Sequence, residues 1–448
     1  MFLPDDVWID IIGLLNDYNT LKQICTTNRL FSHHCQRHLF KDVVLAVALG
    51  KPELWTRMIQ LQKALAHNPR LSGFVKSLCF RISQESCNAL YWEDEAESRN
   101  INQEFQDAIC PLLSQLESLD TLFIDNAATA DFLTIPLHSE RFFRSITSHL
   151  SVLRLRSVAF DIPLSFLCGL PRFEELWVVM ASVRIVRDRP ANLRPVRPKI
   201  LAFVHRNLRV IQNQVDIQPH LEDVLGPPTD DTLALDKLQH FAFSDNSNLN
   251  HQRAQDVLKA SSNTLRKISY HIPSYSAGGF HTERIDSPLI GQSNRQVFAS
   301  LLSLREFDFY VWGLDCADDL LQIRYKLPNE AHHSVTGWIV NSCKVLDACP
   351  NLTTLRINIT YLYNHHIFLQ LISEWSTLNS HLKGGLLPSL KRLTFYLDLS
   401  EEWTKTDPNW KDLLKFDDFV NDVFAGALER GIEVVVGYGF DKQYSMSL

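Results

Sequence analysis

Leu352-Thr353-Thr354-Leu355-Arg356-Ile357 is the clearest copy of a pattern that returns along most of this chain: apolar, two polar residues, then apolar, any, apolar. Alternation over the last three positions is typical of a short strand with one buried face. We predict parallel strands in one sheet, because strands joined by helical or looped crossovers run parallel. The other copies are Val75–Phe80, Leu119–Ile124, Leu150–Leu155, Phe173–Val178, Leu238–Phe243, Leu265–Tyr270, Leu304–Phe309 and Leu390–Phe395.

The copies are unevenly spaced, from 23 residues between Leu153 and Leu176 to 48 between Phe307 and Leu355. A gap of 65 residues before Phe241 predicts one weak copy near residues 200–204. The middle apolar residues that we expect to be buried in the sheet are Leu122, Leu153, Leu176, Phe241, Ile268, Phe307, Leu355 and Leu393.

These units resemble leucine-rich repeats, whose strand has the form Leu-x-x-Leu-x-Leu and is followed by a helix or loop. The resemblance implies an α/β fold, an irregular solenoid with a parallel sheet. The chain departs from the family at the position that usually holds Asn or Cys, so the buried polar ladder of that position is not expected. Four copies have other residues there, namely Ala127, Trp312, Thr360 and Asp398.

Segments between the strands carry helical patterns. Residues 52–67 are predicted to bury Trp55, Ile59 and Leu65 and to stop at Asn68-Pro69, and residues 102–116 form a second helix kinked at Pro111. A third helix over residues 416–430 ends at Gly431, which suits a left-handed cap, and an apolar strand follows over residues 432–436. Because a solenoid needs its last edge covered, we expect residues from about 411 onward to cap it.

Four stretches lack these patterns and are predicted loops: residues 83–100, 187–199, 226–228 and 272–296. Long loops in repeat proteins can carry binding specificity, and they can equally be solvated insertions.

The first forty residues form a different segment. Seven of the nine positions from Val7 to Leu15 are apolar, so a helix there is hydrophobic nearly all round and must be covered on more than one face. Pro4 suits a first helical position, and two further helices are predicted around Leu21 and from Arg29 to Phe40. Three helices of this size cannot bury so much apolar surface alone, so we expect a partner surface to cover them.

This segment resembles an F-box. The residues that carry the resemblance are Leu3-Pro4, Asp6, Ile11, Leu15, Leu21, the run Cys25–Phe31 and Leu39-Phe40. The resemblance implies that residues 1–45 dock on the adaptor Skp1, which tethers the chain to a cullin-based ubiquitin ligase, while residues 46–448 recruit a protein target. The residues it assigns to Skp1 binding are Leu3, Pro4, Val7, Ile11, Leu15, Leu21 and Phe31. The alternative is a helical end of a larger fold, buried within the chain.

Composition narrows the function classes. The chain has 44 Lys and Arg against 51 Asp and Glu, a net charge of −7, which argues against a nucleic-acid partner. No stretch approaches eighteen uninterrupted apolar residues and no secretory signal begins the sequence, so neither a membrane span nor export is expected. Nine scattered cysteines without a Cys-x-x-Cys motif favour reduced thiols in an intracellular protein of the cytoplasm or nucleus.

Signatures of catalysis were sought and not found. Neither a phosphate-binding glycine loop nor a Gly-x-Ser-x-Gly or His-Glu-x-x-His motif occurs, and Gly437-Tyr438-Gly439 lacks the third glycine of a dinucleotide site. His34 and His38 could approach zinc together with Cys25, but Cys35 lies on another helix face. We therefore expect no catalytic residues, no metal and no cofactor.

The sequence thus predicts a substrate-recognition subunit of a Skp1-cullin-F-box ubiquitin ligase, acting by tethering. Large or charged strand residues that face away from the core are expected to bind the target: Arg154, Trp177 and Arg356. The loops at 187–199 and 272–296 are the next candidates. Two other functions stay open: a repeat scaffold that works without ubiquitination, and an enzyme with an unfamiliar site.

Overall fold

The structure is a computed structural model. It describes residues 11–12, 14–15, 17–27, 29–48, 55–83, 95–126, 139–146, 149–156, 159–179, 182–186, 195–204, 233–244, 248–272, 294–311, 335–362, 375–399, 421 and 423–440. The chain divides into two compact units, Met1–Val196 and Arg197–Leu448. Each unit is built on parallel strands of the main sheet that follow one another in chain order.

The strands of the first unit lie in the order β1-β2-β3-β4-β6, and every neighbouring pair is parallel. Their bounds are β1 Asp42–Ala48, β2 Ser77–Ser83, β3 Thr121–Asn126, β4 Val152–Arg156 and β6 Glu175–Val179. A separate small parallel sheet pairs β5, Ala159–Pro163, with β7, Ser182–Val186. Neither β1 nor this small sheet was predicted from the sequence.

The strands of the second unit lie in the order β8-β9-β10-β11-β12-β13-β14 and are also parallel. Their bounds are β8 Ile200–Val204, β9 His240–Ser244, β10 Lys267–Ile272, β11 Glu306–Val311, β12 Thr354–Leu362, β13 Arg392–Leu399 and β14 Glu433–Phe440. The predicted weak copy near residues 200–204 is therefore confirmed as β8.

The repeat pattern is confirmed by burial and register. The eight middle residues, from Leu122 to Leu393, all lie on strands of the main sheet and are at most 1% exposed. Equivalent positions face one another across neighbouring strands, as Ile268, Phe307 and Leu355 do. The alternating apolar residues therefore form one continuous core layer within each unit, which gives a mixed α/β fold with an open parallel sheet.

A backbone ladder fixes where each strand begins. The carbonyl oxygen of Arg266, one residue before β10, accepts hydrogen bonds from the N–H groups of Arg305 (2.9 Å) and Glu306 (3.0 Å) at the start of β11. The Arg305 carbonyl accepts in the same way from Thr353 and Thr354. The same two-donor contact recurs at Lys41, Lys76, Asp120, Ser151, Lys199, Gln239 and Thr353.

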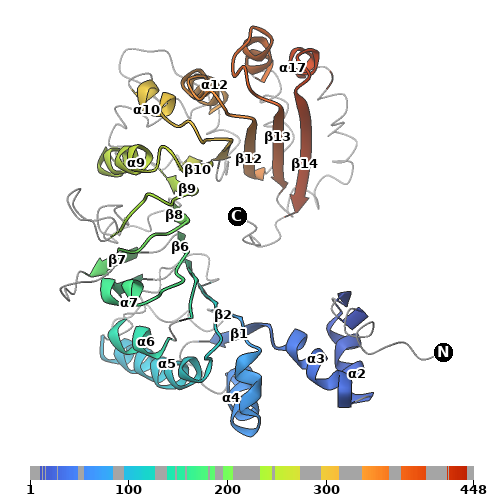
Figure 1. Ribbon diagram of the computed structural model, residues 1–448, viewed down its shortest axis with the longest axis vertical. Helices are drawn as coiled ribbons and strands as arrows, with labels where there is room; N and C mark the ends of the chain where they lie inside the picture. The colour runs from blue at the N-terminus through green and yellow to red at the C-terminus, as the bar shows by residue number, and fades with distance from the viewer. Residues whose placement is uncertain are drawn as a thin grey trace. The chain divides into compact units, whose positions relative to one another are not determined.

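The helices that connect the strands lie on one face of the sheet within each unit, whereas α2 and α3 precede β1 and lie beside it (Figure 1). Those of the first unit are α2 Tyr18–Thr27, α3 Arg29–Leu39, α4 Thr56–His67, α5 Glu95–Gln115, α6 Ser139–Ser145 and α7 Leu164–Cys168. Those of the second are α9 Asn248–Ala260, α10 Arg295–Ala299, α12 Val335–Leu346 and α17 Ala425–Glu429, with a further helical turn over residues 375–383.

The helix predicted over residues 52–67 is α4, and it ends before Asn68 as expected. Trp55 and Leu65 are buried, but the prediction for Ile59 is wrong, because Met58 and Leu61 face the core instead. The predicted loop over residues 83–100 is also wrong at its end, since α5 begins at Glu95.

The last described helix ends at Gly431, as the sequence predicted. Gly431 has a φ of +74°, its N–H donates to the Leu428 carbonyl (2.8 Å), and the Ile432 N–H donates to the Ala427 carbonyl (3.1 Å). These two bonds close α17 as a left-handed Schellman cap. The strand β14 follows and is the edge strand of the second unit.

Candidate functional site

The N-terminal helices α2 and α3 have a small core of their own. Ile12, Leu21 and Cys35 are buried together, and the partly buried residues packed against them are Leu15, Ile24, Cys25, Phe31 and Leu39. The Asp17 carboxylate caps the start of α2 by accepting the Thr20 N–H (2.7 Å). Hydrogen bonds from the side chain and backbone of Thr20 hold the pKa of Asp17 below its usual value.

This small core leaves apolar side chains uncovered. Leu14 is 81% exposed, and Ile11, Leu15 and Phe31 are only partly buried, whereas Leu21 is buried inside the cluster. Leu3, Pro4 and Val7 lie outside the described residues. The ring of His33 on α3 packs edge-on against Phe74, at 5.0 Å between centroids, which joins the helices to the sheet-bearing part of the first unit. Residues 42–45, assigned to the N-terminal segment by sequence, belong to β1.

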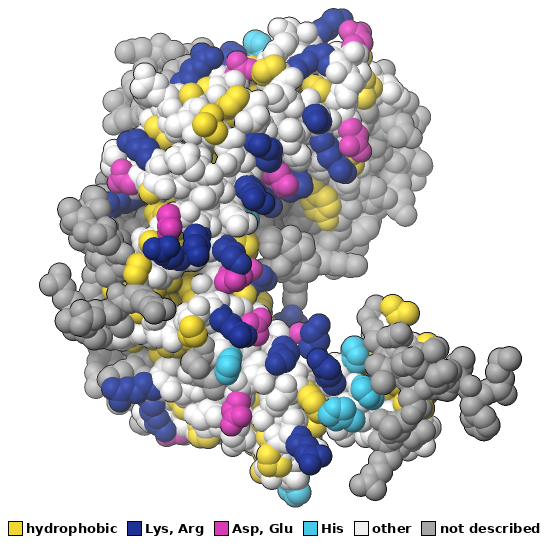
Figure 2. Space-filling view, in the orientation of Figure 1, with side chains coloured by type: hydrophobic (Ala, Val, Ile, Leu, Met, Phe, Trp, Pro, Cys, Tyr) yellow, Lys and Arg dark blue, Asp and Glu magenta, His cyan; other side chains and the backbone are white. Residues whose placement is uncertain are grey.

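Figure 2 shows histidine side chains gathered near the N-terminal helices, where α3 contributes His33, His34 and His38. No group of three or more His, Cys, Asp or Glu residues within the described part of the chain could hold a metal ion. Among the described residues, no helix is long and apolar enough to cross a membrane.

Two of the three predicted target-binding residues meet on the first unit. Arg154 on β4 and Trp177 on β6 occupy paired positions, and the Arg154 guanidinium lies 5.1 Å from the centre of the Trp177 ring. Both side chains donate to the Glu175 carboxylate, from Trp177 Nε1 at 2.9 Å and from Arg154 Nη2 at 3.3 Å. Trp177 is only 1% exposed. The Trp177 ring therefore packs against Arg154 and has almost no exposed surface of its own.

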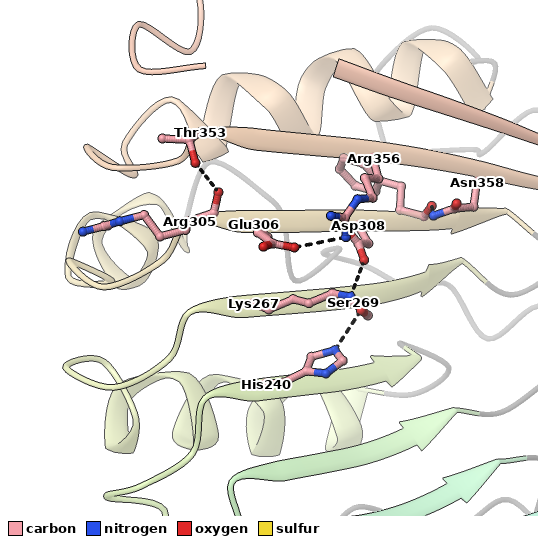
Figure 3. Close-up of polar contacts among 10 residues, drawn as sticks. His240, Lys267, Ser269, Arg305, Glu306, Asp308, Thr353, Arg356 and Asn358 are labelled. Carbon is pink, nitrogen blue, oxygen red and sulfur yellow. Dashed lines mark hydrogen bonds and ion pairs between the residues drawn. The ribbon is translucent and has the colours of Figure 1, made fainter. Parts of the chain in front are cut away.

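The third residue, Arg356, lies on the second unit among charges that the sequence analysis did not single out. Figure 3 shows Asp308 between the side chains of Lys267 and Arg356, which come from the strands on either side of β11. Lys267 Nζ lies 2.9 Å from Asp308 Oδ2, and Arg356 Nη1 lies 3.5 Å from Asp308 Oδ1. Arg356 also pairs with Glu306 at 3.0 Å. Two cations and two carboxylates therefore balance one another across three strands.

The two carboxylates of this cluster differ in how far they are buried. Asp308 is fully buried, while the side chain of Glu306 is 39% exposed. Burial raises the pKa of Asp308 above the usual range of aspartate, although Lys267 and then Arg356 act against that rise. The ion pairs thus compensate a charge that the fold has already removed from water.

Two histidines extend the polar layer. His240 Nε2 lies 2.9 Å from the Ser269 hydroxyl, and the His271 ring stacks on Tyr310 with centroids 4.3 Å apart. Burial lowers the pKa of each histidine to about 3, with Lys267 contributing to both and His240 contributing to that of His271. Both imidazoles are therefore neutral at pH 7.

A histidine within hydrogen-bond distance of a serine hydroxyl is the pairing that activates a nucleophile. Ser269 has no exposed surface, and the pKa of His240 lies far below the range in which a general base works at neutral pH. The arrangement therefore serves packing and polar satisfaction within the sheet. Arg356 and Glu306 are the most exposed members of this charge cluster, with side chains 36% and 39% exposed.

No protein-family model matches the chain, and no curated protein matches it.

Sequence reasoning missed Glu175, Lys267 and Asp308. Each is a polar residue beside the apolar positions of its copy, at a site expected to alternate toward the other face. Aligning the copies by their middle residues would have placed Ser269, Asp308 and Arg356 at the same position, as the register does. The pairing of these polar residues can be seen only when the copies are compared, and no single copy indicates it.

Proposed function

We propose that this chain is a substrate-recognition subunit of a Skp1-cullin-F-box ubiquitin ligase. In this proposal the N-terminal helices bind Skp1 and the parallel-sheet body holds a protein target. The chain itself performs no chemistry and acts by raising the local concentration of the target near the ligase. The role implies an intracellular chain, in the cytoplasm or nucleus.

The observation that carries the proposal is the exposed apolar surface of the N-terminal helices. Their own core consists of three buried side chains, and Leu14 stands 81% exposed beside it. Clustered apolar side chains that a small module leaves in water favour a protein partner. The F-box resemblance of the same residues supplies Skp1 as that partner.

The body supports the second half of the proposal. In each unit the strands present polar and charged residues on the face opposite the apolar core, where a carboxylate holds Arg154 in the first unit and Arg356 in the second. Arginine is enriched among residues that anchor protein interfaces, and a guanidinium held by a carboxylate loses little further freedom on binding. This face is where we place the target.

The test of Skp1 binding compares two exposed leucines. Leu14→Asp places a charge in the proposed contact, whereas Leu302→Asp places the same charge on a side chain 55% exposed in the second unit. Burying a leucine contributes about 1.5–3 kcal/mol, so Leu14→Asp is expected to weaken Skp1 binding by roughly tenfold or more. The measurement is the affinity of purified full-length chain for Skp1.

A second variant changes Leu3 and Pro4 together to Ala and is expected to weaken capture as well. Wild-type affinity for Skp1 in both Leu14→Asp and the double variant would reject the proposal, and equal loss in Leu302→Asp would point to misfolding.

A scaffold that works without ubiquitination would also bind Skp1. Cullin recovered together with wild-type chain, and lost with Leu14→Asp, separates the ligase subunit from that scaffold. Recovery of Skp1 without any cullin favours the scaffold.

A further inference from the structure

The residues that immediately precede β8 to β13 of the second unit form a row along one edge of the sheet. We call these six residues the second-unit edge row: Lys199, Gln239, Arg266, Arg305, Thr353 and Lys391. Each is joined to the next by main-chain hydrogen bonds, from the Gln239 N–H to the Lys199 carbonyl (2.8 Å) through to the Lys391 N–H and the Thr353 carbonyl (2.9 Å). Their order and spacing are therefore set mainly by the backbone, with one added side-chain bond from the Thr353 hydroxyl to the Arg305 carbonyl (3.2 Å).

The second-unit edge row is positively charged, whereas the net charge of the whole chain is negative. Four of its six members are Lys or Arg and none is Asp or Glu, in a protein whose net charge is −7. The corresponding residues of the first unit, the first-unit edge row, are Lys41, Lys76, Asp120, Ser151 and Glu174, where two cations meet two acids. The four basic side chains of the second-unit edge row are all exposed.

Nearby carboxylates do not neutralise Arg266 and Lys391. Glu306 pairs with Arg356 at 3.0 Å and Glu433 pairs with Arg392 at 3.7 Å, so the acids at the next position along the strands already have other partners. Within the described part of the chain, no ion pair joins Arg266 or Lys391 to an acid. Figure 2 shows how often Lys and Arg side chains recur over the described surface in that view.

We propose that the second-unit edge row binds an acidic, extended segment of a protein partner. Neighbouring strands lie about 4.8 Å apart, so the row from Lys199 to Lys391 spans about 24 Å. An extended segment rises about 3.3 Å per residue and covers that length with roughly seven residues. Glutamate or aspartate side chains spread along such a segment would meet the cations while its backbone follows the edge.

This inference deepens the proposed function, on which it rests, by giving the chemical class of the target. The row borders the face on which the target is placed, since the residue after each rung, such as Lys267 or Glu306, begins a strand of that face. A short acidic protein segment fits better than nucleic acid, because the negative net charge of the chain repels a long, continuously charged polyanion more strongly.

The test uses a fluorescein-labelled peptide of roughly ten residues, alternating Glu and Ser, and full-length chain. The variant Arg266→Gln/Lys391→Gln removes two charges from the row, and the matched control Lys41→Gln/Lys76→Gln removes two charges from equivalent rungs of the first unit. Because all four side chains are exposed and the rungs use main-chain atoms, both variants are expected to unfold at the wild-type temperature.

We expect the variant of the second-unit edge row to weaken peptide binding by about fivefold or more, and the control to leave it within about twofold. Arg266→Lys/Lys391→Arg, which keeps the charges, is expected to bind as the wild type does, and added salt is expected to weaken binding.

Three results would overturn the inference: no binding of the peptide by the wild type, equal loss in the control, or tighter binding of a single-stranded oligonucleotide of equal charge that is lost in the same variant. Skp1 affinity is measured on the same preparations. If the wild type does not bind Skp1, the proposed function is rejected. The inference about the acidic segment is then still decided by the peptide measurements.

Discussion

Asp308 shows how a single buried carboxylate organises the polar face of the second unit. It has no exposed surface, its pKa is raised by burial, and it depends on Lys267 at 2.9 Å and Arg356 at 3.5 Å. Removing one partner of a buried ion pair costs more than removing both, because the remaining charge keeps its desolvation penalty. The cluster can therefore be tested as a unit.

Lys267→Met is expected to lower the free energy of unfolding by about 3 kcal/mol, because it leaves Asp308 buried beside the more distant Arg356. The double variant Lys267→Met/Asp308→Asn is expected to recover most of that loss. Urea unfolding of the single and double variants measures both. Equal losses in the two variants would show that the contact between Lys267 and Asp308 is of no consequence for stability.

His271 gives a prediction about pH. Its pKa is about 3 in the folded chain and about 6.5 when exposed, so below pH 6.5 the unfolded chain binds a proton that the folded chain does not. Stability from this residue is therefore complete above pH 6.5 and is lost as the pH falls toward 3. Each histidine of this kind contributes a slope of about 1.4 kcal/mol per pH unit in that window.

Replacing this residue, as His271→Asn, is expected to flatten the fall in unfolding free energy between pH 6.5 and pH 5 by about that slope. Asp308 titrates with the opposite sign, since a raised pKa makes the folded chain bind the extra proton. Its contribution cancels when the variant is compared with the wild type. Parallel curves for the two proteins would mean that His271 is accessible to protons in the fold.

Residue patterns in the sequence predicted the core and missed this polar layer for a physical reason. Alternation marks Ile268 and Phe307 as buried on one face, because an apolar side chain gains from burial wherever it is covered. Ser269 and Asp308 are buried only because partners on neighbouring strands satisfy them, and those partners are set by register. The predicted burial of Ile59 was wrong for a similar reason, because the side of a helix that becomes buried depends on how the helix packs against its neighbours.

At the scale of elements, the C-terminal cap depends on one glycine. Gly431 adopts a φ of +74°, and nothing lies within 4 Å of where a Cβ would stand. The penalty for any other residue is therefore conformational and not steric. The cap matters because Gly431 joins α17 to β14, the strand that completes the sheet of the second unit.

Gly431→Ala is expected to lower the free energy of unfolding by about 1–2 kcal/mol, the cost of a left-handed conformation for a residue with a Cβ. Gly73→Ala is the matched control, because its Cβ also meets open space and its φ is not positive. Thermal unfolding compares the two variants. Equal stability of both would show that the α17 cap is not limiting for the fold.

The elements between the strands were only partly predictable. α4 carries its own stop signal at Asn68, and α17 ends at Gly431, so local chemistry sufficed for those two ends. β1 follows the repeat as Phe40-Lys41-Asp42-Val43-Val44-Leu45, in register with the next copy, but the resemblance to an F-box assigned these residues to the N-terminal segment. The pair β5 and β7 lies outside the predicted copies and depends on mutual pairing. The site residues Arg154 and Arg356 were found from the strand pattern, whereas their carboxylate partners needed the register.

At the scale of the whole molecule, the N-terminal helices and the sheet are separate sources of stability. The helices have their own small core, and the ring of His33 on α3 contacts that of Phe74 in the sheet-bearing part of the first unit. Lys41 must be kept in any truncation, since its carbonyl accepts the N–H groups of Lys76 and Ser77.

Removal of residues 1–40 is expected to leave the body folded, with an unfolding temperature close to that of the full chain and no remaining affinity for Skp1. Circular dichroism and thermal unfolding measure the first expectation, and a Skp1 binding assay measures the second. Loss of the cooperative transition on truncation would show that the helices are part of the body's core.

The backbone ladder at the strand starts has a consequence for how such a protein can change over generations. Each rung is made by a carbonyl oxygen and two N–H groups, so a side chain is not needed for it, although the Thr353 and Ser151 hydroxyls add a bond to the same carbonyls. Lysine, aspartate and serine all occupy equivalent rungs here without altering the backbone contact. Single substitutions in the gene can therefore change the charges along this edge of the sheet, and with them the binding partners. Such substitutions have little effect on the stability of the fold.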